Sequence, residues 1–121
     1  MADLHTMLAW TFSQEVPVPG DIRDLLIDGE EAQIAYKTVR DVAVVTNKRF
    51  IIADKQGITG KKVEVYSIPF KSIDMYSTEN AGRLDLNAEI ELWTRTGRMK
   101  INLGRGVDIR KLDKIIASAI L

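Results

Sequence analysis

Apolar and polar residues alternate along most of the chain from residue 31 to residue 103, which is the pattern of half-buried β-strands. In "AEIELWT", Ile90 and Leu92 would face a core while Glu89 and Glu91 face water. About seven short strands with regularly spaced turns are typical of a small antiparallel sandwich or barrel. The predicted strands lie at residues 33–39, 42–46, 50–54, 62–68, 72–77, 88–94 and 99–103.

The C-terminal segment changes from a strand period to a helical one. Its apolar residues recur every three or four positions, which predicts an amphipathic helix, and Asp108 can cap the first turn. The apolar stripe consists of Ile109, Leu112, Ile116 and Ala119. One helix after a set of antiparallel strands is expected to bury this stripe at the open end or seam of the sheet.

The N-terminal segment also has helical spacing. Leu4, Met7 and Leu8 predict a short helix over residues 3–13, which "VPVPG" ends, and a second short helix follows Asp21. We therefore expect a helical extension, residues 1–27, packed on a domain formed by residues 28–121. That domain is expected to be mainly β, a seven-stranded barrel or sandwich capped by one helix.

Composition narrows the function class. The 121-residue chain carries 17 basic and 17 acidic residues, a balance that disfavours nucleic-acid binding. It has no cysteine, so disulfides, thiolate metal sites and cysteine nucleophiles are excluded. No apolar run is long enough to cross a bilayer and no secretory signal pattern is present. We expect a soluble cytoplasmic protein.

Candidate catalytic chemistry is sparse. His5 is the one histidine and lies far in sequence from the carboxylate-rich segments, so neither a catalytic triad nor a transition-metal site is indicated. Glu89 and Glu91 share one face of a predicted strand. They could act as paired catalytic carboxylates, or they could simply belong to the solvent-exposed face of a half-buried sheet. We expect no enzyme activity, no cofactor and no metal.

The stretch "DKQGITGKK" at residues 54–62 resembles a phosphate-binding loop at first sight. Two residues separate Gly57 from Gly60, whereas a P-loop needs four, and a strand rather than a helix follows. The GxxG loop of nucleic-acid-binding KH domains joins two helices, which these flanks do not predict. The glycines are therefore predicted to serve a hairpin turn.

Basic residues gather around this hairpin and the preceding turn, against the single acid Asp54. They could form an anion site if the two turns lie side by side, or they could keep strand ends soluble. Peripheral binding to anionic lipid is the corresponding functional alternative. The residues concerned are Lys48, Arg49, Lys55, Lys61 and Lys62.

Several short sequence motifs, taken in order, resemble those of the bacterial pleckstrin-homology-like family. They include "RD" followed by a hydrophobic run, then "TNKR", "DKQG", "TGKK", "SIP" and "GVDIRKL". The resemblance covers about residues 26–120. One motif departs from the family pattern. "ENAG" has Asn80 where the family usually has threonine, which puts a role for a hydroxyl at this position in doubt.

The resemblance implies a barrel of the pleckstrin-homology type with no enzymatic activity. It also implies assembly as a cyclic homo-oligomer, a pentameric ring in single-domain members, with a polar surface between protomers that binds an unknown protein partner. Carried over by motif, the expected binding residues are Arg40, Asp41, Asn47, Lys48, Arg49, Asp54, Lys55, Gln56, Lys61, Lys62 and Glu79. The first hairpin turn, "KTVRD", has fewer basic residues than the corresponding turn of phosphoinositide-binding relatives. This difference argues against binding of a lipid headgroup.

Overall fold

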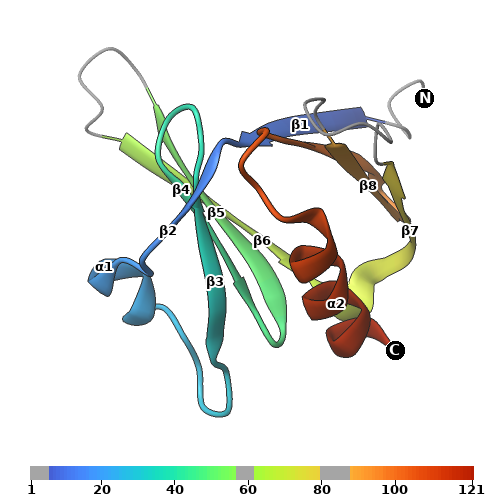
Figure 1. Cartoon of the computed structure of the whole chain (residues 1–121). Coiled ribbons are helices and arrows are strands. Elements are labelled where there is room, and N and C mark those ends of the chain that lie inside the picture. Colours follow the sequence, from blue (N-terminus) through green and yellow to red (C-terminus); the bar gives the residue numbers. More distant parts are fainter. Residues whose placement is uncertain (1–5, 57–61, 80–87) are drawn as a thin grey trace.

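The computed structural model describes residues 6–56, 62–79 and 88–121, and its described strands form two sheets (Figure 1). The four-stranded sheet has the order β1-β9-β8-β7, and the five-stranded sheet has the order β2-β3-β4-β5-β6. The strands of the first sheet are β1 (Thr6–Phe12), β9 (Gly97–Leu103), β8 (Ala88–Thr94) and β7 (Ile73–Glu79). Those of the second are β2 (Gln14–Val16), β3 (Ala32–Lys37), β4 (Val42–Thr46), β5 (Arg49–Gln56) and β6 (Lys62–Pro69).

The main core lies between the two sheets and is closed by helix α2 (Ile109–Ile120), which lies between them in Figure 1. Leu112 and Ile116 of α2 are fully buried against inward-facing residues of both sheets. The Asp108 carboxylate accepts hydrogen bonds from the backbone N–H groups of Arg110 and Lys111, so it caps the helix as predicted. The mainly β fold with one C-terminal helix is confirmed.

A smaller cluster covers the outer face of the five-stranded sheet. Short helix α1 (Gly20–Arg23) places Ile22 against Val44 and Ile51, together with Val16 and Val18 of the preceding segment. β4 is therefore buried along its whole length, which explains its unbroken run of apolar residues. The 3-10 helix η2 (Phe70–Ser72) connects the two sheets at the corner between β6 and β7.

The helix predicted over residues 3–13 is wrong, because residues 6–12 form β1 and pair in parallel with β9. Leu8 and Trp10 lie opposite Met99 and Ile101, and their spacing of two residues places them on one face of the strand. The chain then passes to the other sheet as β2, and the count of strands is nine within the described residues. Within residues 6–27, the described part of the segment predicted as a helical extension, only α1 is helical.

Gly104, which follows β9, lies against Ser13, where the chain passes from β1 in one sheet to β2 in the other. Its N–H donates to the carbonyl of Phe12, and a Cβ at this position would lie 2.6 Å from the carbonyl oxygen of Ser13. A larger residue would push two backbone segments apart. The Ser13 N–H donates to the Lys37 carbonyl, which begins the pairing of β2 with β3.

Candidate functional site

Of the basic residues predicted as one patch, Lys48 and Arg49 lie at the start of β5, whereas Lys55 and Lys62 lie at the far end of the β5–β6 hairpin. In the register of β5 with β6, Arg49 is opposite Pro69 and Gln56 is opposite Lys62. Seven strand intervals of about 3.3 Å separate these ends by roughly 23 Å. Lys61 lies outside the described residues. The predicted contiguous patch is therefore not formed by Lys48 and Arg49 with Lys55 and Lys62.

At the first end, Arg49 is committed to the fold. Its guanidinium donates to both carboxylate oxygens of Glu30, at 2.8 and 3.0 Å, and also to the Leu25 carbonyl and the Ser67 hydroxyl. Thr46 donates to the same carboxylate at 2.7 Å. These contacts hold the pKa of Glu30 well below its ordinary value of 4.5, at about 2, chiefly through the hydrogen bonds from Arg49 and against the effect of burial.

Asn47 belongs to the same structural turn. Its amide donates to the Gly29 carbonyl at 3.0 Å, and its side-chain oxygen accepts from the backbone N–H of Glu31 at 2.7 Å. Three of the four residues of "TNKR" thus join the β4–β5 turn to the loop before β3. The Lys48 side chain is exposed beside them.

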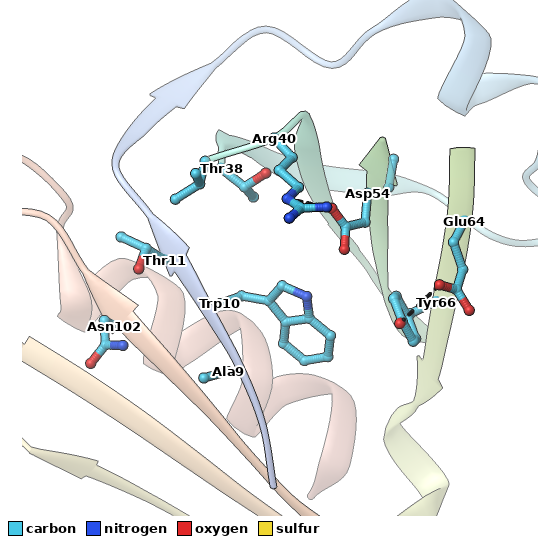
Figure 2. Close-up of a pocket in the computed structure, with 11 residues that line it drawn as sticks. Ala9, Trp10, Thr11, Thr38, Arg40, Asp54, Glu64, Tyr66 and Asn102 are labelled. Atoms are coloured by element: carbon cyan, nitrogen blue, oxygen red, sulfur yellow. Dashed lines mark hydrogen bonds and ion pairs between the residues drawn. The ribbon is translucent and has the colours of Figure 1, made fainter. Parts of the chain in front are cut away.

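At the opposite end of β5 a hollow of about 440 Å³ opens between β1 and the inner face of β5 and β6 (Figure 2). Trp10 points from β1 across this hollow toward Tyr66 of β6, and the two rings meet edge-on with centroids 5.5 Å apart. Its polar lining is made of Thr11, Thr38, Arg40, Asp54, Glu64, Tyr66 and Asn102. We call this hollow the seam groove.

Charge in the seam groove is unevenly distributed. Asp54 and Glu64 are direct cross-strand partners on β5 and β6, and like charges in that relation destabilise a sheet. The Nε atom of Arg40 lies 3.8 Å from Oδ1 of Asp54, and the Tyr66 hydroxyl donates a hydrogen bond to Glu64 at 3.1 Å. That hydrogen bond raises the pKa of Tyr66. Among the described lining side chains, two carboxylates face one guanidinium.

The remaining predicted site residues divide between turn and strand end. Asp41 closes the β3–β4 turn, since its N–H donates to the Thr38 hydroxyl and its carbonyl accepts from the Thr38 N–H. Glu79 is the exposed last residue of β7, opposite Glu89 of β8. Of the predicted residues with described side chains, only Arg40 and Asp54 line the seam groove.

Trp10, Glu64 and Tyr66 line the groove but are not among the predicted binding residues. They come from β1 and β6, and nothing local shows that these strands approach each other. The alternation in "KVEVYSI" does indicate that Glu64 and Tyr66 share a face. The one further signal in the sequence was the presence of a tryptophan, Trp10, in the N-terminal segment.

A second surface lies on the outer side of β6, which is an edge strand of its sheet. Val63 and Val65 are 48% and 44% exposed there, and Leu25 is 44% exposed. The Arg49 guanidinium contacts both the Leu25 carbonyl and Ser67, two residues along β6 from Val65. We call Val63 and Val65 the β6 apolar strip.

Within residues 6–56, 62–79 and 88–121, no three histidine or acidic side chains come close enough to hold a metal ion. No helix in these same segments has the length and apolar character needed to cross a membrane.

Comparison with known proteins gives a consistent assignment. The family model described as Bacterial PH domain matches residues 3–120. The uncharacterized protein YjqA of Bacillus subtilis is 51% identical over 76 residues, which cover 63% of this chain and 61% of YjqA. This chain therefore matches less than two thirds of YjqA's length.

Two crystal structures are similar in both fold and sequence. A protein with a pleckstrin-homology domain from Shewanella loihica PV-4 has a TM-score of 0.79 and 37% identity, covering 89% of this chain and 97% of that one. A pleckstrin-homology domain from Shewanella amazonensis SB2B has a TM-score of 0.66 and 45% identity, covering 84% and 83% of the two chains. The chain belongs to the bacterial pleckstrin-homology domain family.

Proposed function

We propose that the protein is a non-catalytic protein-interaction module that assembles as a cyclic homo-oligomer, a pentameric ring. The pleckstrin-homology fold indicates a non-enzymatic binding module. The observation that carries the assembly is the β6 apolar strip, because it lies on an eight-residue edge strand that pairs on one side only among the described strands. Long exposed apolar edges favour pairing with another chain.

A ring requires a head-to-tail contact between two different surfaces of the protomer. β7 is the edge of the other sheet, and it presents Met75, which is 55% exposed. β6 and β7 meet at η2, so their outer edges diverge from one corner of the molecule. Two distinct edges with exposed apolar residues are compatible with a head-to-tail contact.

The proposed polar surface for partners follows from the same strand. β6 carries Val63 and Val65 on its outer face, and Glu64 and Tyr66 on the face that lines the seam groove. Assembly through β6 would bring the groove close to the junction between protomers. Partner binding and assembly would then share one element.

Peripheral binding to anionic lipid has less support. It needs several cations on one face, and the basic residues with described positions lie at opposite ends of the β5–β6 hairpin. Arg49 is also engaged by Glu30, whose side chain is fully buried.

Sedimentation velocity on three proteins tests the assembly. Val65→Asp places a charge on the β6 apolar strip, and Leu121→Asp places the same charge at a C-terminal residue that is 95% exposed. We expect the first variant to sediment as a smaller species and the second to match the wild type, with circular dichroism unchanged in both. Unchanged sedimentation of folded Val65→Asp would remove β6 from the interface.

A further inference from the structure

The chain crosses from β1 to β2 at Ser13, and the seam groove opens where β1 moves away from β3. The Ser13 N–H donates to the Lys37 carbonyl at 2.8 Å, and Gln14 lies opposite Lys37 in the pairing of β2 with β3. Thr38 and Val39, the residues that follow Lys37, line the groove. Along the groove, β1 therefore has a neighbour on one edge only among the described strands, and that neighbour is β9.

The other edge of β1 presents its backbone to the groove. Successive residues of a strand point their N–H and C=O groups to opposite edges. The Phe12 carbonyl accepts from the Gly104 N–H, on the β9 side, whereas Ser13 bonds on the other side. Ala9 and Thr11 alternate in step with Ser13, so their N–H and C=O groups face the groove that both residues line. Such a row of backbone groups is what a strand edge offers to an added strand.

A strand added along this edge would meet two different surfaces. On the core side it would lie beside Trp10, which points across the hollow and meets Tyr66 edge-on (Figure 2). On the outer side it would lie beside Ala9 and Thr11, with Asn102 of β9 opposite Thr11. Side chains of the added strand would alternate between these surfaces. An apolar side chain suits the core side, and small polar side chains suit the outer side.

We propose that the seam groove binds an extended segment of a partner protein, which pairs with Ala9 and Thr11 on the free edge of β1 and packs an apolar side chain on Trp10. Val39 is 82% exposed and adds apolar surface to the same groove. The hollow of about 440 Å³ lies within the size range of pockets that bind ligands. This inference rests on the proposed role as a protein-binding module, but it does not need the ring.

NMR of the isotope-labelled wild-type protein provides two readouts, the affinity for a peptide and the hydrogen exchange of single backbone amides. The probes are capped seven-residue threonine peptides that differ only in the central residue, which is leucine, serine or glutamate. A fourth probe is the leucine peptide with N-methyl groups on two consecutive central residues. These groups block both edges of the peptide, because consecutive N–H groups point to opposite sides.

Two variants of one exposed residue of β1 form a matched pair. Ala9→Pro removes an N–H that faces the groove and leaves the pairing with β9 intact, a place where edge strands tolerate proline. Ala9→Thr keeps that N–H and introduces a residue favoured in strands. Circular dichroism and denaturant unfolding check the fold of both variants. The exchange measurement on the wild type needs neither of them.

We expect the leucine peptide to bind and to slow exchange of the Ala9 and Thr11 amides. The serine peptide should bind about tenfold more weakly, because it buries less apolar surface against Trp10. The glutamate peptide should be weaker still, and the N-methylated peptide should not bind. Ala9→Pro should weaken the leucine peptide about fivefold or more, whereas Ala9→Thr should match the wild type.

Equal affinity of the leucine and serine peptides, or a preference for glutamate, would overturn the inference. Undiminished binding of the N-methylated peptide, unchanged exchange at Ala9 and Thr11, or absence of binding at millimolar peptide would also contradict it. If Ala9→Pro alone were smaller than wild type in light scattering, a second copy of the chain would occupy this edge instead. A monomer that selects leucine contradicts only the ring, and a ring that binds no peptide contradicts only this inference.

Discussion

The Glu30 carboxylate accepts hydrogen bonds from Nε and one terminal nitrogen of the Arg49 guanidinium, at 2.8 and 3.0 Å, across a sequence separation of 19 residues. Arg49 also binds the Leu25 carbonyl and the Ser67 hydroxyl. One guanidinium therefore ties the segment after α1 to β6, next to the β6 apolar strip. The stability of this end of the molecule depends on that pair.

Glu30→Gln should destabilise the protein by about 3 kcal/mol, because it leaves the Arg49 charge without its carboxylate in a largely buried place. Denaturant unfolding measures the loss, and Glu31→Gln provides the control. Glu31 is exposed and neighbours the pair in sequence, so its substitution should cost less than about 0.5 kcal/mol. Equal losses in the two variants would contradict a special role for Glu30.

The same pair predicts a pH dependence. The pKa of Glu30 is lowered from 4.5 to about 2, so the unfolded chain binds a proton at a higher pH than the folded chain does. The stability contributed by Glu30 is fully present above about pH 4.5, and it is lost as the pH falls toward 2. Wild type and Glu30→Gln should therefore converge in stability on acidification, and parallel curves would refute the pKa assignment.

A substitution of Tyr36 is expected to stabilise the protein, in contrast to Glu30→Gln. Its ring stacks on Phe12 with centroids 5.0 Å apart, and its hydroxyl is buried with no hydrogen-bond partner among the described residues. Burial raises the pKa of this hydroxyl, with further contributions from Glu15 and Asp108. Tyr36→Phe should stabilise the protein by about 1 kcal/mol, because it removes an unpaired polar group and keeps the stacked ring.

Thermal and denaturant unfolding of Tyr36→Phe check this expectation, with Phe12→Ala as the contrasting variant that removes the stacked partner. Phe12→Ala should lose about 3–5 kcal/mol. A Tyr36→Phe variant less stable than wild type by 1 kcal/mol or more would show that the hydroxyl is satisfied in solution.

The α2 cap can be tested by Asp108→Ala. The Asp108 side chain accepts from the N–H groups of Arg110 and Lys111 at 3.1 and 3.2 Å, so its removal should cost about 1 kcal/mol. Asp113→Ala within the helix provides a matched loss of charge without loss of a cap. If both variants lose the same stability, charge rather than capping would explain the effect.

Local patterns predicted the strands and the last helix well, because burial on one face imposes a period of two or of about 3.6 residues. β4 and β8 begin and end at the predicted residues, and Asp108 caps α2. The segment containing β1 was predicted as a helix because Leu4, Met7 and Leu8 fit helical spacing. Its strand conformation depends on pairing with β9, some ninety residues later, which local periodicity cannot show.

The candidate site was less predictable for the same physical reason. The sequence words selected Arg40 and Asp54, which line the seam groove, together with Asn47 and Arg49, which are used within the fold. Polar residues that stabilise a turn and polar residues that bind a partner have the same composition. Trp10 and Tyr66 meet only through the tertiary fold, so their pairing had no local signature.

Native mass spectrometry of the wild-type protein, over a range of micromolar concentrations, tests the proposed assembly most directly. We predict one dominant species with five times the 13.6 kDa mass of the chain, and no dependence on concentration within that range. A dominant 13.6 kDa monomer at all concentrations would contradict the ring.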